Sequence, residues 1–222
     1  MTRSSLPLPL LAVLAVMAMT VPVVALAGGN ACDRGATQCT GTNGSDKLTT
    51  GDTDDTLLGL GGNDRLNSAG GDDHLDGGPG NDTLHMGTGN DTGDGGSGRD
   101  VVLGDEAGPG GRDVINGGPG NDRLFGMAGD NDVVDGGSGN DVIHGGSGKN
   151  DIHRGGPGND TMDDAPRGAA SADVFDGGSG NDDIFARDGK RDTIDCGPGR
   201  DIAKVDSKDK VASNCERVVR QG

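Results

Sequence analysis

The chain has 222 residues, of which 46 are glycine, and aromatic residues make up only 1% of it. Its formal net charge of -17 disfavours binding to nucleic acid and to anionic membrane surfaces. Such a composition excludes a conventional core of large apolar side chains and by itself favours disorder. A fold is therefore expected only if the sequence carries a regular pattern.

Residues 1–27 are predicted to be a secretory signal peptide. Arg3 gives a short positive start, residues 6–26 are apolar, and Ala25-Leu26-Ala27 reads as a small-x-small cleavage site. The alternative is a membrane anchor, which the prolines within the apolar stretch argue against. We therefore expect cleavage, an extracellular protein and no membrane span in the mature chain.

The four cysteines predict two disulfides, because thiols of a secreted chain are expected to be oxidised. Local pairing is favoured, which gives Cys32–Cys39 in an N-terminal cap over residues 28–40 and Cys196–Cys215 near a C-terminal cap over residues 205–222. Each disulfide would staple one end of a repeat array. Zinc binding is the alternative reading, but no histidine lies near either pair.

A nine-residue motif recurs between residues 41 and 204. Its pattern is Gly-Gly-x-Gly-x-Asp-x-apolar-x, and residues 77–85 match it at every position. The glycines allow positive φ and a sharp turn, and the aspartate offers a short, hard oxygen ligand. The triplet after the aspartate is a minimal strand with its central side chain inward. The predicted inward residues are Leu48, Leu57, Leu66, Leu75, Leu84, Val102, Ile115, Leu124, Val134, Ile143, Ile152, Met162, Phe175, Ile184, Ile194 and Ala203, with a lapse at Gly93.

These repeats resemble the hemolysin-type calcium-binding repeats, also called RTX nonapeptides, from Gly41 to about Lys204. The resemblance implies an all-β fold, a right-handed parallel β-roll with two nonapeptides per turn. It also implies several Ca²⁺ ions between stacked loops, held by aspartate side chains and loop carbonyls. About eight turns are expected. The tail from Cys196 to Val218 resembles the terminal cap of secreted actinobacterial repeat proteins.

Alternate repeats of such a roll face opposite sides, so the acids form two rows. The odd row, with nearly perfect loops, is Asp46, Asp64, Asp82, Asp100, Asp122, Asp141, Asp160, Asp182 and Asp201. The even row, with degraded or stretched loops, is Asp55, Asp73, Asp91, Asp113, Asp132, Asn150, Asp173 and Asp192. The expected carbonyl ligands are Gly78, Gly80, Gly96, Gly98, Gly118, Gly120, Gly137, Gly139, Gly156, Gly158, Gly178 and Gly180. Our hypothesis is that the odd row is the main calcium row.

No catalytic site is predicted. The carboxylates are explained as ligands, and His74, His85, His144 and His153 are expected to face outward from their strands. We therefore interpret the chain as a secreted calcium-binding protein with a structural or interaction role, which folds when calcium binds. The alternatives are an adhesin-like or toxin-like module that binds a protein or cell-surface partner through exposed strand faces, and the remnant tail of a secreted hydrolase.

Overall fold

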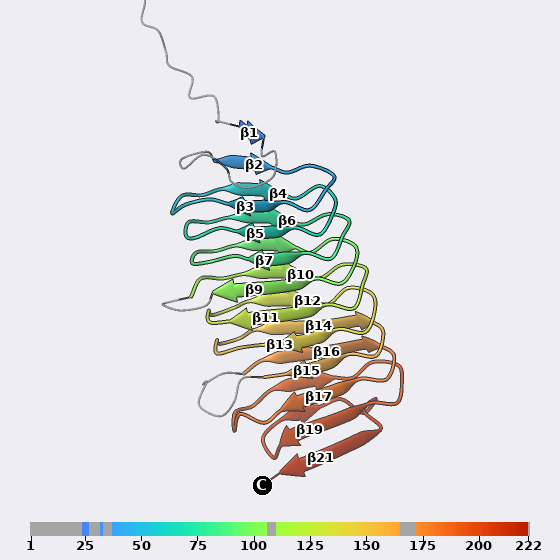
Figure 1. Cartoon of the computed structure of the whole chain (residues 1–222). Coiled ribbons are helices and arrows are strands. Elements are labelled where there is room, and N and C mark those ends of the chain that lie inside the picture. The colour runs from blue at the N-terminus through green and yellow to red at the C-terminus, as the bar shows by residue number, and fades with distance from the viewer. Residues whose placement is uncertain (1–23, 27–31, 33–36, 106–109, 165–171, 222) are drawn as a thin grey trace, which may run out of the picture.

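The computed structural model describes the whole chain except residues 1–23, 27–31, 33–36, 106–109, 165–171 and 222. Strands are the only regular secondary structure of the described residues, and they stack from the N-terminal to the C-terminal end of the molecule (Figure 1). They make a parallel β-solenoid of about nine turns, against the eight expected. The all-β, parallel architecture predicted from the nonapeptide is confirmed.

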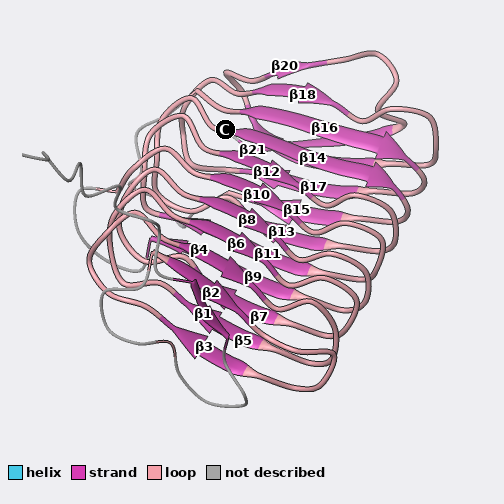
Figure 2. Ribbon diagram, turned by 90° about the horizontal axis from the view of Figure 1, so that it is seen from above, coloured by secondary structure: helices cyan, strands magenta, loops and turns pink. Residues whose placement is uncertain are grey.

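Two parallel sheets make up the solenoid, and the chain passes from one to the other after almost every strand. The first sheet contains, in spatial order, β1 (Val24–Leu26), β2 (Gln38–Thr40), β4 (Thr56–Leu58), β6 (His74–Asp76), β8 (Thr92–Asp94), β10 (Val114–Asn116), β12 (Val133–Asp135), β14 (Ile152–Pro157), β16 (Val174–Ser179), β18 (Thr193–Asp195) and β20 (Lys210–Val211). The second contains β3 (Lys47–Thr49), β5 (Arg65–Asn67), β7 (Thr83–His85), β9 (Val101–Asp105), β11 (Arg123–Met127), β13 (Val142–His144), β15 (Thr161–Asp163), β17 (Asp183–Ala186), β19 (Ile202–Asp206) and β21 (Arg217–Gln221). The loops line both edges of the stack (Figure 2).

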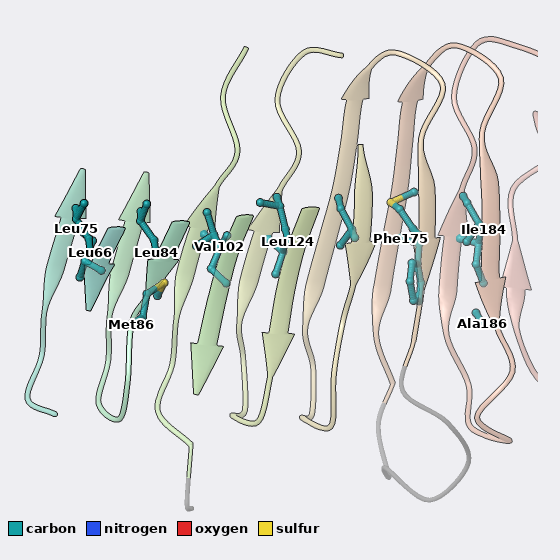
Figure 3. Close-up of a cluster of buried hydrophobic side chains, with 14 of the residues drawn as sticks. Leu66, Leu75, Leu84, Met86, Val102, Leu124, Phe175, Ile184 and Ala186 are labelled. Atoms are coloured by element: carbon teal, nitrogen blue, oxygen red, sulfur yellow. The ribbon is translucent and has the colours of Figure 1, made fainter. Parts of the chain in front are cut away.

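The strands are short because each carries one buried side chain between two outward ones. In β5, for example, Leu66 is buried while Arg65 and Asn67 are exposed. Parallel pairing in register stacks equivalent residues, so Leu66 lies between Leu48 and Leu84. The resulting ladder fills the space between the sheets (Figure 3). Every predicted inward residue is buried except Ile152.

The prediction that Ile152 faces inward and His153 outward is wrong. Ile152 is half-buried, whereas His153 is fully buried and pairs in register with Val134 and Phe175 of the core ladder. The His153 ring lies 4.9 Å from the Phe175 ring, measured between centroids. The other three histidines do lie at outward strand positions, His74 exposed and His85 and His144 half-buried.

Both predicted disulfides are present, Cys32–Cys39 at the N-terminal end and Cys196–Cys215 at the C-terminal end. The last strands, β20 and β21, still pair in register with β18 and β19, so the C-terminal cap continues the two sheets. Most of the predicted signal peptide lies outside the described residues. Its residues Val24–Leu26 form β1, which pairs with β2, so cleavage after Ala27 would leave β2 as the terminal strand. No helix that could cross a membrane occurs in the described part of the chain.

Candidate metal centre

The acids of the odd row form a continuous hydrogen-bonded ladder along one edge of the stack. The backbone N–H of Asp82 donates to Oδ1 of Asp100, one turn further on, at 2.7 Å. The same bond joins Asp46 to Asp64, Asp64 to Asp82, Asp100 to Asp122, Asp122 to Asp141, Asp141 to Asp160, Asp160 to Asp182 and Asp182 to Asp201. Glu216 ends the row, because its Oε2 accepts the N–H of Asp201 at 2.9 Å.

The even row forms a matching ladder, with one correction to the prediction. Its members are Asp55, Asp73, Asp91, Asp113, Asp132, Asp151, Asp173, Asp192 and finally Asp209. The structure places Asp151, not Asn150, in this row, because Oδ1 of Asp151 accepts the N–H of Asp132 at 2.9 Å. Asn150 lies on the loop outside the ladder.

A seven-residue loop explains this shift. Residues 145–151 and residues 126–132 each hold one residue more than the usual six between the first glycine and the acid. The extra residue takes a left-handed conformation, with φ of 61° at Asn150 and 69° at Asn131, which asparagine tolerates better than most residues. Each later residue therefore moves one position along, which brings Asp151 into the ladder and His153 into the core.

From the second acid of each row onward, Oδ1 accepts the N–H of the preceding acid, which leaves Oδ2 for another partner. In the described residues Oδ2 is buried without a hydrogen-bond donor in Asp64, Asp82, Asp100, Asp122, Asp141, Asp160, Asp182 and Asp201 of the odd row. The same holds for Asp55, Asp73, Asp91, Asp113 and Asp192 of the even row. Buried carboxylate oxygens without a partner are costly, so repeated rows of them indicate a cation that these side chains are shaped to hold.

The first glycine of each odd-row loop lets two oxygens approach its backbone closely, where a side chain would clash with them. A Cβ on Gly77 would lie 2.6 Å from Oδ2 of Asp82 and 2.6 Å from the carbonyl oxygen of Gly95. An equivalent pair of oxygens lies at Gly41, Gly59, Gly95, Gly117, Gly136, Gly155 and Gly177. Carboxylate and carbonyl oxygens are the ligands that calcium prefers. Among the even-row loops, this pairing of an acid Oδ2 with the next turn's carbonyl recurs only at Gly104, within the described glycines.

The second and third glycines, whose carbonyls were the predicted ligands, are required mainly by the stacking of turns. Gly78 has a φ of 85°, and a Cβ on it would lie 2.2 Å from the Leu60 carbonyl oxygen. A Cβ on Gly98 would lie 1.5 Å from the carbonyl oxygen of Gly80. The Gly78 carbonyl also accepts the N–H of Ser97 at 3.0 Å. At the first glycines, whose carbonyls we did not predict as ligands, a Cβ would instead meet the acid Oδ2 and a carbonyl oxygen of the next turn.

Burial raises the pKa of most ladder acids. The pKa of Asp100 rises to about 7, first because the carboxyl is desolvated and then because Asp122 and Asp82 are negatively charged; the N–H of Asp82 opposes this shift. The pKa of Asp113 rises to about 8 for the same reasons, with Asp105 the strongest charged neighbour. Adjacent carboxylates therefore destabilise one another unless protons or cations neutralise them.

Two further carboxylate clusters lie in the even row where the loops are stretched. Asp91, Asp105 and Asp113 form the first, and Asp164, Asp173 and Asp192 form the second. In each cluster the ligand oxygens all lie within 4.8 Å of one another. Asp105 and Asp164 were not predicted as ligands, because neither occupies the acid position of the nonapeptide. The inserted lengths before Asp113 and Asp173 were the sequence signal that could have found them.

A comparison of the sequence with protein-family models identifies the repeat. The model of the RTX calcium-binding nonapeptide repeat (4 copies) matches residues 40–75, 68–102, 108–133, 129–162 and 167–191. The chain belongs to this family. The RTX match thus covers most of the solenoid, with the odd acid row from Asp46 to Asp182 and the even row from Asp55 to Asp173, and these ladders are those of a calcium-binding repeat. A comparison with curated proteins finds none that matches this RTX chain.

Proposed function

We propose that this RTX protein is secreted and folds as calcium enters its loops, with a structural or interaction role outside the cell. The observation that carries the proposal is the row of buried aspartates whose Oδ2 atoms have no hydrogen-bond donor in the described residues. Calcium would neutralise these carboxylates and join successive turns, so binding and folding are coupled. The two disulfides support an oxidising, extracellular setting.

We propose a binding role rather than catalysis for the same acids. Their Oδ1 atoms are held by backbone N–H groups and their Oδ2 atoms are buried without a donor in the described residues, which is an arrangement suited to ligating ions. Calcium affinity is expected on the order of 10⁻⁴ to 10⁻³ M, the range of extracellular calcium modules. Binding is expected to be cooperative, since each ion stabilises an interface between neighbouring turns.

Far-UV circular dichroism of residues 28–222 tests the proposal. The chain is first treated with chelator and then titrated with calcium or, as a control, with magnesium. A steep rise of β-structure signal with calcium and little change with magnesium is expected. Full β signal in chelator, unchanged by calcium, would contradict calcium-coupled folding.

A second candidate function is partner binding by the outer surface of the second sheet. The Phe125 and His144 rings stack there with centroids 4.8 Å apart, and the Lys204 Nζ lies 4.1 Å from the Phe185 ring centroid. Co-sedimentation with purified bacterial cell wall, compared between the natural chain and a Phe125→Ala, Phe185→Ala variant, tests this function. Equal sedimentation of both chains would argue against it.

A further inference from the structure

The last residue of β9, Asp105, is an acidic residue at the position where the repeat normally has its second glycine. Gly104 occupies the position of the first glycine, since a Cβ on it would lie 2.6 Å from the Gly126 carbonyl oxygen and 2.9 Å from Oδ2 of Asp113. The next residue, Asp105, continues the strand and pairs in register with Met127 instead of turning. Asp105 is fully buried. The extension of β9 therefore brings a third carboxylate next to those of Asp91 and Asp113.

The distances among the three acids fit a single ion. The ligand oxygens of Asp91, Asp105 and Asp113 lie within 4.8 Å of one another. Two oxygens that share one calcium ion lie at most about 4.8 Å apart, because each calcium–oxygen distance is about 2.4 Å. One cation at the centre of this cluster would therefore reach all three side chains.

Each acid of the cluster also has an oxygen that needs a partner. Oδ1 of Asp105, Oδ2 of Asp91 and Oδ2 of Asp113 are buried without a hydrogen-bond donor within the described ranges. The other oxygen of Asp105 accepts the N–H of Gly111 at 2.6 Å, which fixes the carboxylate in position. An unpartnered and fully buried carboxylate oxygen beside two others is costly without a cation.

We propose that Asp91, Asp105 and Asp113 form the tightest calcium site of this protein. This proposal rests on the proposed calcium-binding function and adds a site that the nonapeptide pattern does not contain. Calcium affinity rises with the number of charged ligands in a preformed site. Among the described residues no odd-row loop brings three carboxylates together, whereas this site does so with all three acids buried; in the cluster of Asp164, Asp173 and Asp192 one acid is only half-buried.

Isothermal titration calorimetry with calcium tests the proposal on residues 28–222. The natural chain is expected to show one tighter site that fills before a weaker class. Asp105→Asn, which keeps the shape but removes the charge, is expected to weaken the tighter site by about tenfold or more and to leave the weaker class unchanged. Asp52→Asn is the matched control, because Asp52 is exposed on another even-row loop. An unchanged tight site in Asp105→Asn would overturn the proposal.

Asp105→Gly covers the case in which Asp105→Asn fails to fold in saturating calcium. Glycine is the residue that the repeat normally has at this position, and this variant is expected to show the same loss. The titration of the natural chain distinguishes failure of the proposed function from failure of this inference. No calcium binding would refute the proposed function, whereas binding without a distinct tight site would refute only this inference.

A crystal structure of the natural chain with one equivalent of terbium gives a direct check. Terbium has oxygen preferences like those of calcium and scatters anomalously. The strongest anomalous peak is expected among Asp91, Asp105 and Asp113. A strongest peak in an odd-row loop, or in the Asp164, Asp173 and Asp192 cluster, would overturn the assignment.

Discussion

The Met86 thioether occupies the space that Gly93 leaves in the core. A Cβ on Gly93 would lie only 2.6 Å from Sδ of Met86, and Met86 is itself fully buried. Met86 stands at the first-glycine position of its loop, so a large side chain there compensates for the lapse in the apolar ladder at Gly93. The two departures from the nonapeptide therefore form one structural unit.

This relationship predicts coupled effects of substitution. Gly93→Leu alone should overpack the core and destabilise the calcium-bound protein by about 1–3 kcal/mol. Met86→Gly alone should leave a cavity and cost about 2–5 kcal/mol. The double variant restores the repeat at both positions and should be close to the natural stability. Urea unfolding in saturating calcium measures the cycle, and additive losses in the double variant would contradict the pairing.

Variants of Asp82 distinguish two roles of a ladder acid, namely binding calcium through its charge and accepting a backbone N–H through Oδ1. Asp82→Asn retains an Oδ1 acceptor for the N–H of Asp64 but loses the charge, so calcium stoichiometry should fall while the calcium-saturated fold remains. Asp82→Ala also removes the acceptor and should cost a further 1–3 kcal/mol or so, because the buried N–H is left without a partner. Calorimetric stoichiometry and urea unfolding distinguish these effects. Equal stability of the two variants would show that the ladder bond contributes little.

Because His153 is buried, we expect the folded protein to lose stability as the pH falls. Burial lowers the pKa of His153 from 6.5 to about 4, although the nearby Asp163 opposes the shift. Between these values the unfolded chain binds the proton and the folded chain does not, so stability falls as pH drops from 6.5 towards 4. The full effect is about 3 kcal/mol, from 1.36 kcal/mol per pKa unit.

The matching variant is His153→Leu, which supplies the apolar side chain found elsewhere in the ladder. The difference in unfolding free energy between this variant and the natural chain should grow as pH falls from 7 to 4. His74→Gln, at an exposed position, is the control and should show no such trend. Parallel curves for the natural chain and His153→Leu would exclude His153 as the cause of acid sensitivity.

Replacing Leu60 by glycine is expected to stabilise the folded protein. It stands at the second-glycine position of its loop with a φ of 75° and an exposed fraction of 45%. Left-handed backbone is unfavourable for leucine, and little packing is lost on its removal, so Leu60→Gly should stabilise the protein by about 1 kcal/mol. Thermal unfolding in calcium measures the effect. Ser138→Gly, at a loop position outside the positive-φ set, should not stabilise and serves as the control.

The nonapeptide by itself determined the parallel solenoid, the inward ladder and most of both acid rows. A strict nine-residue period leaves one apolar side chain per repeat, and only stacking of the turns can bury it. The pairings Cys32–Cys39 and Cys196–Cys215 were also predictable, because each pair is close in sequence at one end of the array.

Tertiary structure decided what happens where the period breaks. An extra residue can bulge at any point of a loop, and only the pairing of stacked strands shows that Asn150 bulges while Asp151 joins the ladder. The contact between Met86 and Gly93 likewise depends on side chains from different strands. Asp105 enters a cluster only because β9 runs on in register with β11. Where the repeat is regular, the local sequence fixes the position of each residue. Where the period breaks, contacts with the neighbouring turns fix those positions.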